Sequence, residues 1–470
     1  MSKSRFERFL LWALNPKVAI PLLILLVLLT APFVYRSSQL AGLPDIGDPF
    51  DVEAFGTVEI SDEENAFVEY IDATPLLVLT AIEPHTALEK VQAAGWSAAD
   101  EDIRTLLDDN RAAMILWREG TQKPDALYHQ PHTIRFDTLI PVTQGLRNFA
   151  RLASLEGLRL EAEGNLTEAW EWYRAVFRCS RHSGKRGTII ERLVGVAMHA
   201  IAVEAIEKWS RDPRVSAAQL RETLEAIRAD YEMTAPTSTM FKVDYLILQN
   251  SLQGLTAKEF IELQGGSRGV PEELLSVQLF LKNEPEVARR VIRYAFTNIL
   301  EHIDKPRHAR PPQTSMMKLF QTAPSTSSDK TTLSTEEIEA WIRRSLGART
   351  LYPSLATADD AAGREEALQA ALEIALAVQI YHREQGEFPE KLENLLNGIL
   401  DELPADPYGK AGEMMRYRRD PTGFTVWSVG PNGTDDGGFV DGSGWDPKSA
   451  DIGFEVETVA AEPGDDSQAE

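Results

Sequence analysis

The chain has 470 residues, of which 43% are hydrophobic and 26% charged, so it is long enough for about two to four domains with hydrophobic cores. The 72 Asp and Glu residues outnumber the 48 Lys and Arg residues and give a formal net charge of −24. Such a chain repels the phosphate backbone, which excludes nucleic acid as a partner. The only cysteine, Cys179, has no partner for a disulfide or a CxxC site, and we expect it to be a small buried residue.

An uncharged apolar run, Val18–Tyr35, lies near the amino terminus. As a helix it extends about 27 Å at about 1.5 Å per residue, close to the thickness of a bilayer's hydrocarbon core. The residues before it are mainly basic, and those after it are mainly acidic. The run therefore predicts a single-pass membrane anchor. The positive-inside rule places residues 1–17 in the cytoplasm and the bulk of the chain outside it.

Two alternatives to the anchor stay open. A cleaved signal peptide usually has a shorter apolar region and a small-x-small cleavage site, and the stretch TAPFVYRSS is a poor match to such a site. A buried core helix is the other alternative, although the length of the run favours a membrane span. No cysteine follows the run closely, which excludes a lipoprotein signal.

Residues 36–60 contain Gly and Pro among acidic residues and are expected to form a tether. A helical body then begins, because Ser61 and Glu64 have the spacing of a capping box. Apolar residues recur at helical spacing before Gly120, and helical patterns continue to about residue 303. They are interrupted at Gly164-Asn165, Gly184, Asp212-Pro213, Ala235-Pro236 and Gly265-Gly266. We expect this body to be all-α.

The Gly164-Asn165 turn and the residues after it resemble the turn and second helix of a tetratricopeptide repeat (TPR). Ala169, Trp170 and Tyr173 follow the turn at matching positions. A repeat array needs about three units to bury a continuous core, and no 34-residue recurrence is present elsewhere. An irregular helical hairpin and a TPR-like hairpin both stay open.

Residues 304–333 are rich in Pro, Ser and Thr and predict a linker. From about Asp359 a long helical pattern runs to Gly386. Residues then alternate in polarity around Met415–Arg418 and Phe424–Trp427, with turn residues between. The carboxyl-terminal part is therefore expected to be a small α+β domain with a long helix and a β-hairpin.

Three sequence blocks follow one another in this region: Tyr381…Gly386-x-Phe388-Pro389-x-x-Leu392, Leu403-Pro404-x-Asp406-Pro407-Tyr408-Gly409 and Trp427-Ser428-Val429-Gly430-Pro431-Asn432-Gly433. By these blocks, the region of about 365–454 resembles the globular end of the major pseudopilin of type II secretion systems. The resemblance implies a calcium site in the loop after the last hairpin strand. The anchor, helical body and carboxyl-terminal module together resemble a group of large membrane-anchored proteins of planctomycete-type bacteria, from which no activity follows.

The chain departs from the pseudopilins in two respects. It lacks their prepilin peptidase site and the glutamate that follows it, and a long helical body separates its anchor from the carboxyl-terminal module. We therefore do not expect it to be processed or polymerised as a pilin.

Calcium is also favoured by the residue types of the loop. Calcium takes six to eight oxygen ligands in flexible geometry, and this loop combines glycines with many aspartates and no His or Cys. A solvated acidic segment is the alternative interpretation. The resemblance implies a carbonyl ligand near Val429 and a side-chain ligand at Asn432. The candidate metal ligands are Val429, Asn432, Asp435, Asp436, Asp441 and Asp446.

No catalytic motif such as HExxH, GxSxG or a P-loop is present, and no cofactor other than Ca²⁺ is expected. The sequence favours a membrane-anchored extracytoplasmic protein that binds protein partners, in a secretion or envelope assembly. An extracytoplasmic hydrolase with its site in the helical body and a helical-repeat scaffold are the alternatives. The expected divisions are a basic segment 1–17, transmembrane helix 18–35, tether 36–60, helical domain 61–303, linker 304–333, pseudopilin-like domain 334–454 and acidic tail 455–470.

Overall fold

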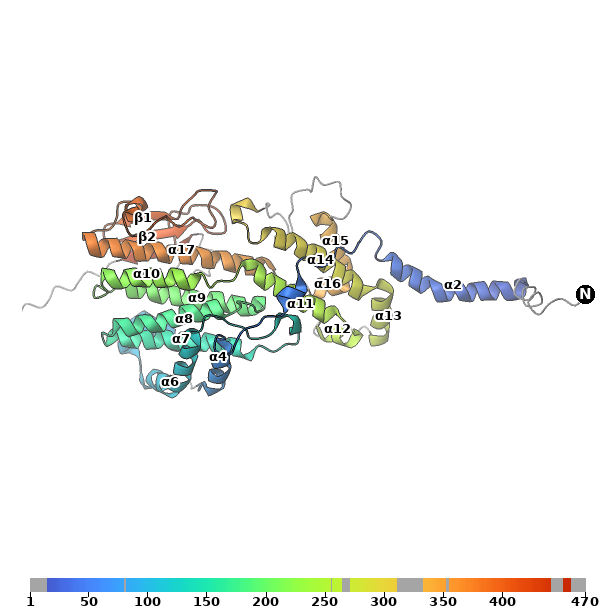
Figure 1. Ribbon diagram of the computed structural model, residues 1–470, viewed down its shortest axis with the longest axis horizontal. Coiled ribbons are helices and arrows are strands. Elements are labelled where there is room, and N and C mark those ends of the chain that lie inside the picture. Colours follow the sequence, from blue (N-terminus) through green and yellow to red (C-terminus); the bar gives the residue numbers. More distant parts are fainter. Residues whose placement is uncertain are drawn as a thin grey trace, which may run out of the picture. The chain divides into compact units, whose positions relative to one another are not determined.

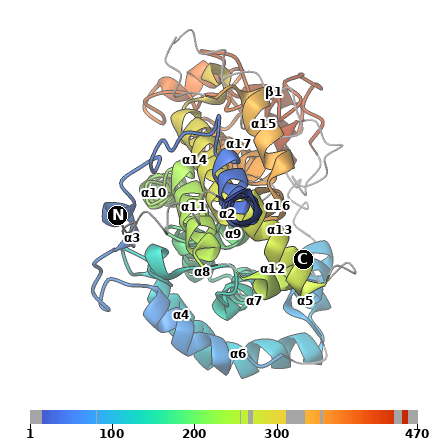
Figure 2. The ribbon, with the colours of Figure 1, turned by 90° about the vertical axis from the view of Figure 1, so that its right-hand side faces the viewer.

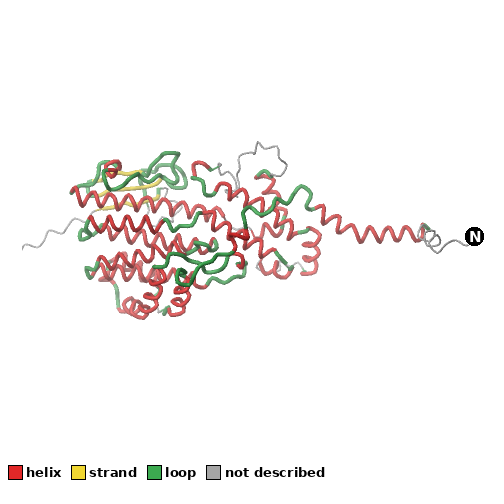
Figure 3. Tube along the Cα trace, viewed as in Figure 1, coloured by secondary structure: helices red, strands yellow, loops and turns green. Residues whose placement is uncertain are grey.

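The computed structural model describes residues 15–79, 82–254, 256–263, 271–310, 333–351, 355–440 and 451–457. These residues are mainly helical, as the sequence predicts, and their one sheet lies near the carboxyl terminus (Figures 1 and 3). The chain forms two compact units, neither of which is one continuous segment. Unit 1 comprises Met1–Val52, Tyr245–Leu300 and Phe320–Pro353, and unit 2 comprises Glu53–Asp244, Glu301–Leu319 and Ser354–Glu470.

The helices are distributed over the two units. Unit 1 contains α2 (Pro16–Ser38), α12 (Ala257–Leu263), α13 (Glu272–Lys282), α15 (Thr335–Arg344) and α16 (Leu346–Leu351). Unit 2 contains α4 (Phe67–Ala73), α5 (Pro84–Ala94), α6 (Glu101–Thr121), α7 (Pro141–Ala162), α8 (Leu166–His182), α9 (Ile189–Ser210), α10 (Ala217–Tyr231) and α17 (Leu355–Gln385). Three helices contribute residues to both units: α3 (Val52–Gly56), α11 (Thr237–Leu252) and α14 (Glu284–His302). The expected boundaries at 303 and 334 do not coincide with this division.

The apolar run near the amino terminus forms α2, which has no buried residue. Asn15 caps the helix by accepting a hydrogen bond from the Lys17 N–H at 3.0 Å. In the described part of the chain, α2 alone is long and apolar enough to span a membrane. A buried core helix is therefore the wrong interpretation, because such a helix would be covered by its neighbours. A membrane span and a signal sequence are both compatible with α2.

The chain after α2 is more ordered than a free tether. α2 itself continues to Ser38, and Leu43 is fully buried in unit 1. The Leu43 carbonyl accepts a hydrogen bond from Arg290 Nη1 of α14 at 3.0 Å. Arg293, also of α14, pairs with Asp45 at 2.6 Å and with Asp48 at 3.0 Å. Two acidic residues of the expected tether, Asp45 and Asp48, are thus partners of Arg293 on α14.

In unit 2 the helical body begins later than expected. The Ser61 hydroxyl contacts Glu64 at 3.0 Å, as in a capping box, but the residues from 62 to 64 form a turn and α4 starts at Phe67. The predicted helix before Gly120 is confirmed as α6, which Asp100 caps through the Ile103 N–H at 3.1 Å.

Helices α7 and α8 form the predicted hairpin. Gly164 adopts the positive φ of 84° that the turn requires, and Asn165 caps α8. Gly157 lets the helices approach closely, because a Cβ there would lie only 2.1 Å from the ring of Tyr173. The hairpin belongs to one packed body, in which α9 packs against α7 and α8.

The long helix α17 ends, as predicted, before Gly386, which has a φ of 79°. It packs against α9 and α10 and also contacts β2 and β3, so it lies inside unit 2 (Figure 1). Figure 2 shows α4 and α6 on the opposite side of unit 2 from β1. Most residues of α17 are therefore buried, among them Leu372, Ile374 and Ala375.

The sheet has the antiparallel order β1 (Arg416–Asp420), β2 (Gly423–Ser428) and β3 (Ile452–Glu457). Asp420 pairs with Gly423, so the predicted hairpin closes with a two-residue turn. The third strand was not predicted. It includes residues 455–457, which the sequence assigned to the acidic tail, because Phe454 and Val456 pair with Val426 and Phe424 of β2.

Candidate functional site

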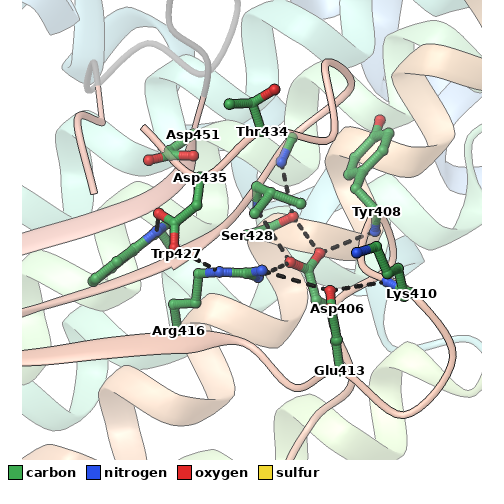
Figure 4. A network of polar contacts seen from close by, with 12 residues as sticks. Asp406, Tyr408, Lys410, Glu413, Arg416, Trp427, Ser428, Thr434, Asp435 and Asp451 are labelled. Atoms are coloured by element: carbon green, nitrogen blue, oxygen red, sulfur yellow. Dashed lines mark hydrogen bonds and ion pairs between the residues drawn. The ribbon is translucent and has the colours of Figure 1, made fainter. Parts of the chain in front are cut away.

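A buried carboxylate, Asp406, organises the carboxyl-terminal module (Figure 4). It lies in the turn before β1 and accepts hydrogen bonds from the Tyr408 N–H at 2.9 Å and the Ser428 hydroxyl at 2.5 Å. Its other oxygen accepts from the Val429 N–H at 3.0 Å and from Arg416 Nη1 at 2.7 Å. These bonds join the turn to β1 and to the end of β2, where the candidate calcium loop begins.

Arg416 connects Asp406 to two further carboxylates (Figure 4). Its Nε donates to Asp435 Oδ2 at 3.0 Å, and its Nη2 lies 3.5 Å from Glu413. Glu413 also accepts from the Lys410 N–H at 3.0 Å. One guanidinium thus balances three carboxylates, an arrangement that fixes the position of the loop after β2.

Asp435 is the predicted ligand with the most contacts. One of its oxygens accepts from Trp427 Nε1 and from the Gly437 N–H, both at 3.0 Å, and the other accepts from Arg416. Burial alone would raise the pKa of Asp435, but these hydrogen bonds and the positive charge of Arg416 lower it. Its carboxylate is therefore a structural partner of the sheet.

The two ends of the loop meet at Asp451, which is buried. Its carboxylate accepts from the Gly438 N–H at 2.8 Å and from the Asp436 N–H at 3.4 Å. Burial raises the pKa of Asp451, and the charges of Asp435 and Asp436 raise it further. The loop consequently holds an excess of negative charge that its backbone N–H groups only partly compensate.

The other predicted ligands lie along this loop. Val429 is buried at the end of β2, and Asn432 stabilises a turn by accepting from the Thr434 N–H at 2.8 Å and donating to Asp436 at 3.1 Å. Asp441 and Asp446 lie outside the described residues. Among the residues that the structure describes, no three Asp, Glu, His or Cys side chains are grouped closely enough to hold a metal ion. The calcium site stays a prediction.

Asp406 was not among the predicted site residues, although Asp406-Pro407-Tyr408-Gly409 belongs to one of the sequence blocks that resemble the pseudopilin. A carboxylate in a turn can accept the N–H of the residue two positions later, which is the bond from Tyr408. That signal predicts the turn but cannot predict that Ser428 and Arg416 from the sheet complete the network, because they lie further along the chain.

Unit 2 also contains a cleft of about 770 Å³ beside α17. At its inner wall, Glu365 is buried and pairs with Arg192 and Arg181 of α9 and α8. Burial alone would raise the pKa of Glu365, but the two guanidinium groups hold it well below its ordinary value. This triad holds α17 to the helical body.

Two further features of the cleft are an arginine pair and a carboxyl group. Arg307 and Arg310, in the segment expected to begin the linker, both contact Asp359 at 2.8 Å. Burial raises the pKa of the neighbouring Glu366. Among the described residues that line the cleft, no Ser or Thr hydroxyl is hydrogen-bonded to a His or a carboxylate.

Cys179 is fully buried, and burial raises its pKa to about 12. The thiol is consequently protonated and unreactive at neutral pH, as expected for a small buried residue.

Comparisons with known proteins supply no relative for this chain: no family model, no curated protein and no solved structure matches it.

Proposed function

We propose that the chain is a membrane-anchored protein that presents its helical body and carboxyl-terminal module outside the cytoplasm to protein partners. The observation that carries this proposal is that α2, an apolar helix of 23 residues, has no buried residue. Side chains such as Leu22, Leu25 and Leu28 are 47%, 51% and 66% exposed, which is costly in water but favourable in lipid. The basic segment before α2 supports a cytoplasmic amino terminus.

Extraction of membranes at alkaline pH tests the anchor. We expect the full-length chain to stay in the membrane pellet after a carbonate wash, because a spanning helix is not released by removing peripheral contacts. A polypeptide that appears intact in the supernatant would contradict the proposal. Release of a chain that begins after Ser38 would instead identify α2 as a cleaved signal sequence, which amino-terminal sequencing of the product decides.

Protease protection tests the orientation. Protease added outside intact spheroplasts should digest the helical body and spare the residues before α2, because only the body is exposed on that side. A tag at the amino terminus and one at the carboxyl terminus report the two sides separately. Protection of the carboxyl-terminal tag would reverse the proposed topology.

For the carboxyl-terminal module we infer that the acidic connection between β2 and β3 binds Ca²⁺. The support is the resemblance of this region to the major pseudopilin, together with the repulsion among Asp435, Asp436 and Asp451 that raises the pKa of Asp451. A divalent cation would relieve this repulsion. Asp435 is already paired with Arg416, so the inference depends mainly on the other carboxylates of the loop.

Thermal melting of the detergent-solubilised full chain tests the calcium site. The full chain is needed because α17 packs on α9 and α10, so the module shares its core with the helical body. Ca²⁺ at about 100 times its dissociation constant should stabilise the protein by about 2.7 kcal/mol relative to EDTA. Asp436→Asn should reduce this shift, whereas Glu457→Gln, at an exposed position of β3, should not. Equal melting in saturating Ca²⁺ and in EDTA would contradict the site.

A further inference from the structure

Helix α13 has two apolar faces, of which only one is buried in unit 1. Leu275 and Leu279 are buried against Ala257 and Phe260 of α12. At about 100° per residue, Leu274, Val277 and Phe280 are centred on the opposite side of α13. These three side chains, which we call the α13 outer face, are 62%, 55% and 41% exposed. Packing against α12 therefore explains the first face and leaves most of the surface of Leu274 and Val277 exposed.

The α13 outer face lies next to the last turns of α2. The rings of Phe280 and Phe33 contact each other edge to face, with centroids 5.8 Å apart. Arg36 Nη1 donates to the Phe280 carbonyl at 2.6 Å, and its guanidinium carbon lies 4.8 Å from the centre of the Phe280 ring. Figure 1 shows α13 at the base of α2 within unit 1. These contacts fix Phe280 at the level of the transition from apolar to polar residues in α2.

We propose that α13 lies in the membrane interface, with the α13 outer face inserted into the leaflet from which α2 emerges. This inference rests on the proposed anchoring by α2. If α2 crosses the bilayer, its contacts with Phe280 bring α13 to the boundary between head groups and acyl chains. An interfacial helix buries its apolar face about 5–10 Å into that boundary. The charged ends of α13, at Glu272 and Lys282, stay within reach of the head groups.

A bilayer fits the α13 outer face better than a protein partner does, because the face continues the exposed apolar surface of α2. Phe33 is itself 60% exposed, so lipid around α2 meets the α13 outer face without a gap. Insertion of α13 would also hold unit 1 against the membrane at two points, α2 and α13.

The experiment uses full-length protein in phosphatidylcholine–phosphatidylglycerol vesicles, with one environment-sensitive fluorophore attached to an introduced cysteine. Val277→Cys and Leu274→Cys report on the α13 outer face, Leu25→Cys on the middle of α2, and Arg343→Cys on an exposed position of α15. The native Cys179 is buried and serves as the unlabelled background. Lipids with a nitroxide at a shallow or a deep acyl carbon act as quenchers.

We expect labels at 277 and 274 to shift to shorter wavelength and to lose more fluorescence to the shallow nitroxide than to the deep one. The label at 25 should lose more fluorescence to the deep nitroxide than to the shallow one. The label at 343 should be quenched by neither nitroxide. If the nitroxides quench the label at 25 but not the labels at 277 and 274, the inference about α13 is overturned and the proposed anchoring by α2 is not affected. If they do not quench the label at 25, both the inference and the proposed anchoring are overturned. The label at 277 could also be shielded from an aqueous quencher but not quenched by either nitroxide. This result would mean that protein covers α13, and it would also overturn the inference.

Discussion

At the scale of single residues, the buried Glu365 and its two arginines form a group in which each charge depends on the others. Arg181 and Glu365 are both almost fully buried, and Arg192 is nearly so. Burying three charges is costly in itself, so the triad adds little net stability compared with a packed apolar group. Removing one member, however, leaves an uncompensated charge in the interior. The triad therefore specifies how α17 fits against α8 and α9.

We predict that Glu365→Gln lowers the free energy of unfolding by about 3–5 kcal/mol at neutral pH, because both guanidinium groups lose their counter-charge. Chemical denaturation followed by far-ultraviolet circular dichroism measures the change. The adjacent Glu366→Gln is the matched control and should not destabilise, since burial disfavours the charged form of Glu366. Equal destabilisation by both variants would contradict the assigned role of Glu365.

The same residue predicts a pH dependence. The pKa of Glu365 is lowered in the folded state, so its contribution to stability is present above the unfolded value of 4.5 and is lost as pH falls below it. The difference in stability between the native chain and Glu365→Gln should therefore narrow steadily below about pH 4.5. A difference that stays constant down to pH 3 would show that shape, and not charge, explains the effect of the substitution.

At the scale of secondary-structure elements, two close approaches determine how unit 2 is built. α7 and α8 meet where Gly157 faces Tyr173, and β2 and β3 meet where a Cβ at Gly453 would lie 1.9 Å from the Val426 carbonyl oxygen. Any larger residue at these glycines forces the elements apart. Neither glycine is needed for a turn, so their importance is visible only in the packed structure.

We predict that Gly157→Ala lowers the free energy of unfolding by about 1–3 kcal/mol through overpacking against Tyr173. Tyr173→Leu should be destabilising alone, because it removes a buried ring and the hydrogen bond to Glu161. In the double variant the two effects should be less than additive, as expected for residues in contact. Strict additivity would show that the helices are free to separate at this point.

At the scale of the whole molecule, the net charge of −24 is the dominant property. Many acids pair with arginines, as Asp45 does with Arg293, but the excess negative charge remains and repels itself. The loop between β2 and β3 likewise contains more negative than positive charges. Calcium and general screening by salt would both stabilise such a chain, so the two effects have to be separated by experiment.

We predict that NaCl raises the melting temperature of the full chain between 0.01 and 0.15 M, because the screening length falls from about 30 Å to about 8 Å. Calorimetry in detergent measures the shift. Ca²⁺ should add a further increase at equal ionic strength, and Mg²⁺, which prefers a more rigid octahedral site, should add less. A melting temperature that falls with NaCl would mean that ion pairs outweigh the long-range repulsion.

Features that depend on neighbouring residues could be predicted from the sequence. The apolar α2, the amphipathic α6, the turn at Gly164-Asn165 and the β1–β2 hairpin all appeared near their expected positions. These features are indicated by a run of apolar residues, by the periodic spacing of apolar residues or by a turn motif, and each of these patterns lies within about 25 residues. Membrane insertion, calcium binding and the pseudopilin resemblance stay predictions.

The structural features that could not be predicted depend on contacts between segments that are distant in the sequence. β3 has no strong strand pattern and forms because β2 offers it an edge, and Leu43 with Asp45 is fixed by α14 from far along the chain. Most residues of α17 are buried by α9, α10 and the sheet, and its sequence pattern does not show which of these neighbours covers which side. The sequence alone determined which segments are helical and that one of them suits a membrane, because backbone propensity and side-chain period act locally. The division into two units and the networks around Asp406 and Glu365 were decided by the tertiary structure, because buried charges need partners that only folding brings together.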